Sequence, residues 1–277
     1  MPAKAEEVIA SVVALWRYPV KSMMGEELAA ADVTEHGLLG DRQYAVVDSG
    51  TGKVASAKNP RKWAPLFGCR ATFLERPSPG APAPRVRITL PDGTAVTSDQ
   101  SDVAAHLSIA LGREVRLAAT PPPIPILEEY WPTVEGLAHA DTVTDEAMPV
   151  GTFFDCALVH LITTATLDRL TSLYPAGRFE APRFRPNILV ALSQHEPGFV
   201  ENEWVGRTLC IGEHVQLSIT GPCARCVMTT LPQGDLPQDS GVLRTAVKEN
   251  QGGVGVYASV ARRGTIRRRD TIRFHSV

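Results

Sequence analysis

Short segments in which apolar and polar residues alternate recur along the whole chain. Two clear cases are residues 86–90 and 215–219, followed by the turn signals Pro91-Asp92-Gly93 and Gly221-Pro222. Alternation with a period of two is typical of strands with one buried face, and Gly-Pro is expected to end the second strand. Helical patterns are few and do not alternate regularly with the strands, which disfavours a doubly wound sheet. We therefore predict a mainly β protein of the α+β class, with a few helices and with its strands in barrels or sandwiches.

The same signals place the individual elements. Two helices are predicted, one over residues 102–111 with Ser101 as its N-cap, and one that starts at Thr164 and stops before Pro175. The proline-rich segment 77–84 is expected to be an exposed loop. The predicted strands and hairpins are 8–15, the hairpin 44–48 with 53–57, the hairpin 86–90 with 94–97, and then 157–162, 187–191, 207–211, 215–220 and 271–274.

A run of prolines divides the chain. With 277 residues, it can form one large domain or two of moderate size. Residues 120–125 read Thr-Pro-Pro-Pro-Ile-Pro, which neither a helix nor the interior of a sheet accommodates. We therefore predict a first domain over residues 1–120 and a second over 121–277.

Composition excludes several classes of protein. The net charge of −2 gives no reason to expect a nucleic acid polymer as partner, and no segment approaches the ~20 apolar residues of a membrane span. Lys4 and Glu6 precede a short apolar run that lacks the cleavage positions of a signal peptide. The five cysteines are an odd number and scattered, so we expect no disulfide framework and a reduced, cytoplasmic setting.

The segment Cys223-Ala224-Arg225-Cys226 is the strongest chemical signal. A cation beside a thiol favours the thiolate, which is a good nucleophile or soft-metal ligand. Half of a zinc site is an alternative reading, but no second cysteine pair completes it. A thioredoxin-type dithiol belongs at a helix start, whereas this motif follows a strand. Two buried, inert cysteines also remain open, because cysteine is often buried.

Two further groups of polar residues are candidates for anion binding. Lys21, Ser22 and Arg42 lie beside turn residues, and a pair of arginines, Arg183 and Arg185, precedes a predicted strand. Cations and a hydroxyl held in turns are able to bind a phosphate or another dianion. For Lys21 or Arg42 alone, solvated surface charge is the better explanation, and the arginine pair alone is also a weak signal.

Taken together, four segments resemble the MOSC proteins, which are molybdenum-cofactor-binding homologues of the C-terminal domain of the cofactor sulfurase. The likeness is greatest to the branch of the mitochondrial amidoxime-reducing component and its bacterial relatives. It implies an N-terminal MOSC barrel-like domain followed by a MOSC β-barrel domain. The segments are residues 15–25 (LWRYPVKSMMG), 37–48 (GLLGDRQYAVVD), 183–190 (RFRPNILV) and 223–230 (CARCVMTT).

The resemblance also implies a role for each matching residue. Cys226 falls on the molybdenum ligand, and Cys223 would be a neighbour only. Asn187 lies near the metal and is counted with Cys226 as catalytic. His160, alone in an apolar run, is expected to be a core residue. The cofactor would be the molybdenum cofactor (Mo-molybdopterin), without dependence on pyridoxal phosphate, and the residues implied to hold it are Lys21, Ser22, Arg42, Asp155, Arg185 and Arg225.

The function implied is reduction of N-hydroxylated compounds: amidoximes, hydroxylamines or hydroxylated nucleobases. Because the chain lacks the four clustered cysteines of an iron–sulfur domain, electrons are expected from an external donor, which would be a ferredoxin, a small haem protein or a flavin reductase. An alternative is a carrier of the cofactor or of sulfur that uses a persulfide on Cys226. A non-catalytic protein of two barrels with buried cysteines is the third possibility.

Overall fold

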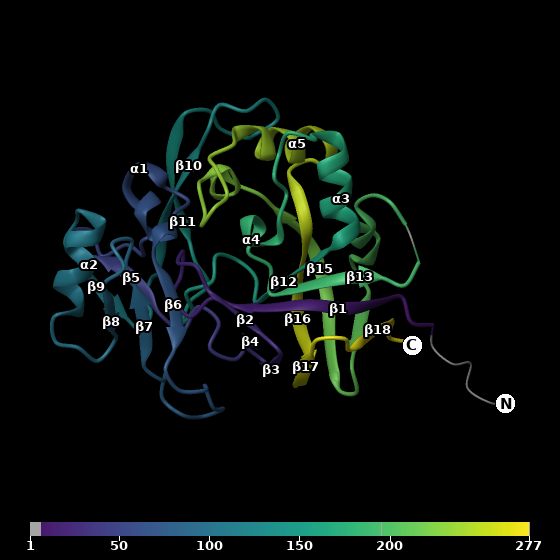
Figure 1. Ribbon diagram of the computed structural model, residues 1–277, viewed down its shortest axis with the longest axis horizontal. Helices are drawn as coiled ribbons and strands as arrows, with labels where there is room; N and C mark the ends of the chain where they lie inside the picture. The colour runs from purple at the N-terminus through teal and green to yellow at the C-terminus, as the bar shows by residue number, and fades with distance from the viewer. Residues whose placement is uncertain (1–6, 195, 277) are drawn as a thin grey trace.

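The structure is a computed structural model that describes residues 7–194 and 196–276. Lys4 and Glu6, which entered the argument against a signal peptide, lie outside the described residues. The main body is a closed barrel, which occupies the right half of Figure 1. Its seven strands follow the order β13 (Ile188–Leu192), β12 (Val159–Thr163), β16 (Gly253–Arg262), β15 (Val215–Ala224), β14 (Thr208–Ile211), β18 (Thr271–Phe274) and β1 (Ala10–Arg17), which pairs back onto β13.

The barrel needs a strand from the beginning of the chain. β1 pairs antiparallel with β13, with Leu15 opposite Ile188, and with β18, with Ala10 opposite Ile272. The short β2 (Glu26–Leu28) extends from β1 outside the closed ring. The domain boundary near residue 120 stays a prediction. In space, the first strand belongs to the same barrel as strands from the second half of the chain.

Most barrel neighbours are antiparallel, but β12 and β13 are parallel. A parallel pair needs a crossover, and α3 (Thr164–Leu173) supplies it. Thr163 caps this helix by accepting a hydrogen bond from the Thr166 backbone nitrogen at 3.1 Å. The remaining elements around the barrel are α4 (Ala181–Phe184), η2 (Val200–Trp204), η3 (Val227–Thr230), α5 (Ser240–Asn250) and the sheet of β17 (Gly264–Arg267), β3 (Ala30–Thr34) and β4 (Gly37–Leu38).

A second body of small sheets lies beside the barrel, on the left of Figure 1. Its core is formed by apolar side chains from several elements, among them Leu66, Ile88 and Leu107. The hairpin of β10 (Ile126–Trp131) and β11 (Thr142–Ala147) rises at the edge of this body. Its elements are β5 (Ala45–Asp48), α1 (Pro60–Trp63), η1 (Ala64–Gly68), β6 (Arg70–Phe73), β7 (Val86–Thr89), β8 (Ala95–Thr97), α2 (Val103–Leu111), β9 (Val115–Ala118), β10 (Ile126–Trp131) and β11 (Thr142–Ala147).

Several sequence predictions are confirmed. The fold is mainly β with short helices, the hairpin at 86–97 is β7 and β8, and the first strand is found as β1, shifted by two residues. The second predicted helix is α3, and the last predicted strand is β18. The first predicted helix is α2, although it begins at Val103 with Asp102 in place of Ser101 at its N-cap.

Two predictions about local structure are wrong. Residues 53–57 do not form the second strand of a hairpin, because only Val54 bridges to Val47 and the ladder partner of β5 is β9. Gly221-Pro222 does not end its strand, since β15 continues to Ala224. Register shifts on both sides of Pro222 show bulges, which let a strand accept a residue that lacks an amide hydrogen. Cys223 therefore lies within the barrel wall.

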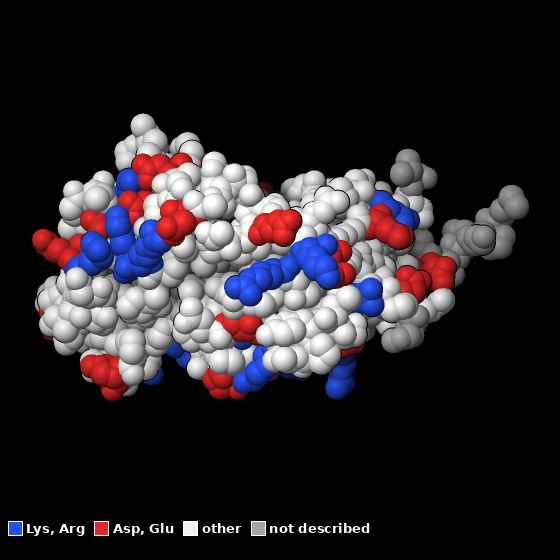
Figure 2. Space-filling model, turned by 90° about the horizontal axis from the view of Figure 1, so that it is seen from above, with Lys and Arg blue, Asp and Glu red and all other residues white. Residues whose placement is uncertain are grey.

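The surface is mixed in charge. Basic and acidic side chains lie next to one another on the face seen from above (Figure 2). In the described residues, no helix has both the length and the apolar character needed to span a membrane. All five cysteines are free thiols.

Candidate functional site

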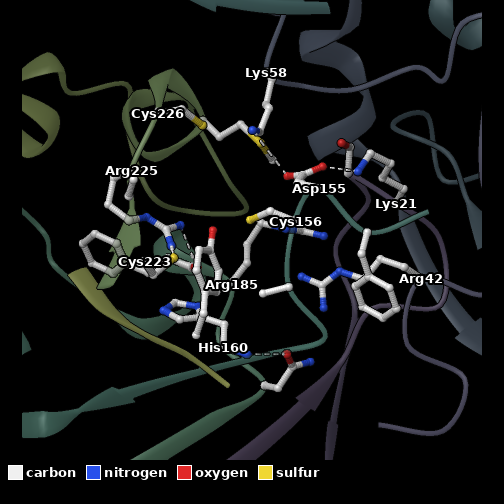
Figure 3. Close-up of a pocket in the computed structure, with 18 residues that line it drawn as sticks. Lys21, Arg42, Lys58, Asp155, Cys156, His160, Arg185, Cys223, Arg225 and Cys226 are labelled. Atoms are coloured by element: carbon white, nitrogen blue, oxygen red, sulfur yellow. Dashed lines mark hydrogen bonds and ion pairs between the residues drawn. The ribbon is translucent and has the colours of Figure 1, made fainter. Parts of the chain in front are cut away.

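A pocket of about 100 Å³ is lined by residues of both the barrel and the N-terminal segments (Figure 3). β15 contributes Cys223, while Lys21 and Arg42 come from loops in the first part of the chain. Residues more than 200 positions apart in sequence thus meet in one cavity. It brings together all the residues implied by the resemblance: Lys21, Ser22, Arg42, Asp155, Arg185, Asn187, Arg225 and Cys226.

Three of these residues have a left-handed backbone. The φ angles are 62° at Ser22, 49° at Arg42 and 53° at Arg185. Residues other than glycine rarely adopt such positive values. Arg185 ends α4, which turns its side chain back into the pocket. Such backbone strain concentrates at binding sites, where the surrounding structure has to hold it.

Two arginines share one aromatic ring. The guanidinium carbon of Arg42 lies 4.6 Å from the centre of the Tyr18 ring, and that of Arg185 lies 4.2 Å from it. The Tyr18 hydroxyl donates to the carbonyl of Pro186 at 3.1 Å. Asp41 forms an ion pair with Arg42 and accepts a hydrogen bond from the Tyr18 backbone at 2.8 Å. These contacts fix both cations along one wall of the pocket.

Two buried guanidinium nitrogens lack a partner among the residues that the structure describes. Arg185 Nη1 donates to the carbonyl of Met23 at 2.8 Å, but its Nη2 has no acceptor. Arg225 Nη2 donates to the carbonyl of Phe184 at 2.8 Å, whereas its Nε has no acceptor. Leaving a buried donor unpaired is costly. Both arginines line the pocket, and the unpaired donors are therefore suited to an anionic ligand.

A carboxylate joins two lysines in the same pocket. One carboxylate oxygen of Asp155 forms an ion pair with Lys21, and the other lies 3.7 Å from Lys58 Nζ. Lys21 also donates to the Phe153 carbonyl at 2.9 Å. Burial alone would raise the pKa of Asp155, but Lys21 and Lys58 lower it well below its usual range. The carboxylate is therefore ionised and neutralises part of the positive charge.

The two cysteines of the motif have opposite environments. Burial would raise the pKa of Cys223, yet the charge of Arg225 and the contacts with His160 and Tyr257 lower it to about 6. Arg225 Nη1 lies 2.6 Å from the Cys223 sulfur. Burial raises the pKa of Cys226 to about 11, against the opposing effect of Lys58. The sequence suggested that Arg225 would stabilise a thiolate on its neighbour Cys226. In the structure, its guanidinium stabilises a thiolate on Cys223 instead.

Asn187 is fully engaged in hydrogen bonds within the protein. Its side-chain oxygen accepts from the His160 backbone at 3.0 Å, and its side-chain nitrogen donates to Asp41 at 3.0 Å and to the Trp16 carbonyl at 3.4 Å. It therefore connects β1, β12 and the loop that carries Arg42. Its catalytic role stays a prediction, while these contacts favour a positioning role.

Three pocket residues were missed or judged differently from sequence. Lys58 and Tyr257 carried no motif, since a single lysine or tyrosine in a strand or turn is ordinary. His160 is buried as expected, with its ring nitrogen 3.1 Å from the Val254 carbonyl, but it also lines the pocket. Arg183, which was paired with Arg185 in the sequence, is fully buried outside the pocket and donates to main-chain carbonyls.

Comparison with known proteins identifies two domains in this chain. Residues 9–108 match the model of the MOSC N-terminal beta barrel domain, and residues 149–273 match that of the MOSC domain. A curated relative, mitochondrial amidoxime reducing component 2 of Rattus norvegicus, is 26% identical over 242 residues, which are 80% of this chain and 67% of the relative.

Among solved structures, the YuaD protein from Bacillus subtilis aligns over 97% of this chain and 96% of its own, with a TM-score of 0.49 and 12% identity. YiiM from Escherichia coli aligns over 44% of this chain and 55% of its own, with a TM-score of 0.34 and 17% identity.

Proposed function

The chain belongs to the MOSC family, with the N-terminal barrel domain followed by the MOSC domain, and we propose from this premise that it binds a molybdenum cofactor and reduces N-hydroxylated compounds. The observation that carries the proposal is the convergence of a thiol, Cys226, with a set of cations in one pocket. The name of the rat relative supplies the reaction class, since that protein is called an amidoxime reducing component.

The chemistry of the pocket fits such a cofactor. Molybdenum in a pterin dithiolene accepts soft ligands, and the Cys226 thiol is partly exposed in the pocket. A phosphate dianion needs several donors, and Arg185 Nη2 and Arg225 Nε are buried without partners in the described structure. Lys21 and Arg42 add positive charge along the same cavity. Cys226 would hold the metal, and these cations would hold the pterin and its phosphate.

The overall reaction is R–NH–OH + 2 e⁻ + 2 H⁺ → R–NH₂ + H₂O, with the electrons from an external donor and the protons from water. When bound, the cofactor would supply the two-electron chemistry that breaks the N–O bond. The protein would hold that group in one pose through Arg42 and Arg185, whose positions are already fixed against Tyr18. Such preorganisation avoids the cost of rearranging charged side chains during the reaction.

The proposal is tested by producing the chain in a host that makes the cofactor and measuring molybdenum, pterin and turnover. We expect nearly one molybdenum and one pterin per chain, and reduction of an aryl amidoxime to the amidine with a reduced viologen as electron source. Ferredoxin, a small haem protein and a flavin reductase are then compared as donors. Protein without molybdenum and pterin would contradict the proposal, and a persulfide found on Cys226 by mass spectrometry would favour the sulfur carrier instead.

A further inference from the structure

Two adjacent glutamates of β10 face opposite sides of the strand. Glu128 accepts hydrogen bonds from Lys53 at 3.2 Å and from Lys62 at 2.8 Å. Glu129 is buried and accepts one from Lys58 at 2.9 Å. Successive side chains of a strand alternate between its faces, so the two ion-pair groups are separated. Lys58 lines the pocket, whereas Lys62, which lies within α1, does not.

The backbone around Lys58 is also held in place. The Ser22 hydroxyl accepts a hydrogen bond from the Ala57 backbone at 3.1 Å, and the Lys58 carbonyl accepts one from the Tyr130 backbone at 2.8 Å. The side chain is only 17% exposed. Lys58 is therefore a positioned cation, built into the site from the N-terminal part of the chain.

The ammonium group of Lys58 has unused donor capacity. It carries three hydrogens, of which one is directed to Glu129. Asp155 lies 3.7 Å away, which is an ion pair rather than a hydrogen bond. Within the described part of the chain, no other acceptor is in hydrogen-bond range of this nitrogen. A further hydrogen is thus available to a ligand in the cavity.

Lys58 lies at the same end of the pocket as Cys226. Figure 3 shows the two side chains together, with Arg42 at the far side. Cys226 raises the pKa of Lys58, and Lys58 lowers the pKa of Cys226. Arg225 is turned away to Cys223, and Arg42 and Arg185 are stacked on Tyr18. Lys58 also influences the Cys226 thiol more strongly than Arg225 does, and both Lys58 and Cys226 line the cavity. Lys58 is therefore the cation best placed to act beside the proposed metal ligand.

We propose that Lys58 binds the substrate directly, by donating a hydrogen bond to the oxygen of the N–O bond while Glu129 holds the ammonium in position. This role rests on the proposed function. Lys58 lends a hydrogen bond only, and the two protons of the reaction still come from water. Although burial opposes it, Asp155 and Glu129 raise the pKa of Lys58 well above its usual range, so the donor stays charged.

Kinetics of the cofactor-loaded enzyme give the first test. We compare Lys58→Met and Lys58→Arg with Lys62→Met, the matched control whose lysine pairs with Glu128 outside the pocket. Because the oxygen becomes more negative as the N–O bond breaks, Lys58→Met should lower kcat/KM for an amidoxime by roughly 100-fold, mostly in kcat. Lys58→Arg should recover part of the loss, and Lys62→Met should stay within about two-fold of wild type.

Molybdenum content and melting temperature are measured on each variant. Unchanged metal and pterin in Lys58→Met, together with the loss in kcat, would support a contact with substrate. A parallel loss of molybdenum would overturn the proposal, because Lys58 would then hold the cofactor. A change in kcat/KM below about three-fold would overturn it as well.

A second test needs no cofactor. The full chain, produced without the cofactor, is alkylated with anionic iodoacetate and with neutral iodoacetamide, and trypsin cleavage after Arg225 separates the Cys223 and Cys226 peptides. A cation beside Cys226 attracts the anionic reagent, so the iodoacetate-to-iodoacetamide rate ratio at Cys226 should fall about three-fold or more in Lys58→Met and not in Lys62→Met. Any change in the thiol itself cancels in the ratio.

The two tests separate the two proposals. Wild-type protein that loads no cofactor or reduces no amidoxime would overturn the proposed function, and the role of Lys58 with it. An active wild-type enzyme with an unchanged alkylation ratio in Lys58→Met would overturn the role of Lys58 alone.

Discussion

Both cysteines of one short motif line the pocket, but the surroundings of Cys223 (the Cys223 end) and of Cys226 (the Cys226 end) differ in charge. At one end, Cys223 is buried in the barrel wall and its negative charge is balanced by Arg225, which lies 2.6 Å from its sulfur. At the other end, Cys226 directly precedes η3 and lines the cavity, where Lys58 influences its thiol more strongly than Arg225 does. A charge satisfied within the protein has no need of a ligand. The comparison teaches that the thiol with the lower pKa already has a charged partner in the protein, whereas the thiol that we propose as the metal ligand has a raised pKa and is only partly buried.

The largest expected difference between the two ends is in metal content. Cys226→Ser should lower bound molybdenum more than ten-fold, because a serine hydroxyl is a poor replacement for a soft thiolate ligand. Cys223→Ser should keep the metal, although Arg225 loses its charged partner. Metal analysis of both proteins, with X-ray absorption to count sulfur neighbours of molybdenum, checks this. Equal loss in the two variants would remove the distinction between the cysteines.

The next largest effect concerns Arg183, which donates hydrogen bonds to the main chain of η3, the segment that follows Cys226. Its guanidinium donates to the carbonyls of Thr229 at 3.0 Å and Leu231 at 3.3 Å, on either side of the end of η3. Arg183→Met should lower the free energy of unfolding by about 3–5 kcal/mol, because several buried carbonyls lose their donor. The surface residue Arg178 is the control, and Arg178→Met should cost much less than Arg183→Met, because exposed ion pairs add little stability. Urea denaturation of both variants measures the difference, and equal costs would contradict it.

A smaller effect is expected at Gly255, which packs under the Cys223 end. Gly255 has a φ of 79°, and a Cβ there would lie 2.4 Å from the His160 ring nitrogen and 2.6 Å from the Leu161 carbonyl. Gly255→Ala should therefore cost about 1–3 kcal/mol in stability. Because the strain falls on the Cys223 end, bound molybdenum should remain near wild type. Gly252→Ala also has positive φ but no atom closer than 3.7 Å, so it separates backbone strain from the clash.

Most strands and helices could be predicted from local sequence patterns, but the pairing of distant strands could not. β7, β8 and α3 were predicted because their signals lie within about ten residues. β16 and α5 were overlooked although the signals exist: Val254, Val256 and Ala258 alternate along β16, and Asp239 caps α5. The entry of β1 into the barrel was not predictable from local pattern, because its partners lie more than 170 positions away.

The candidate site shows the same division. The family resemblance implied eight residues that line the pocket, but it did not indicate which of their side chains contact one another. Arg225 points to Cys223 because the bulged end of β15 decides which side chains meet, and adjacency in sequence does not. Lys58 was missed because its position depends on Glu129, 71 residues later in the chain. Contacts of that kind become visible only in the folded structure.

The last prediction concerns the ionisation of one thiol, and it tests the Cys223 end directly. The pKa of Cys223 is lowered from 9.0 to about 6, so a thiolate absorbance step near pH 6 should be present in the cofactor-free protein and absent in Cys223→Ser. Since the folded pKa lies below the unfolded one, the stabilisation from this thiolate is complete above about pH 9 and is lost as the pH falls through 6. Between these values stability should rise by at most about 1.4 kcal/mol per pH unit relative to Cys223→Ser. A step that disappears with Cys226→Ser instead would assign the stabilised thiolate to the opposite end of the pocket.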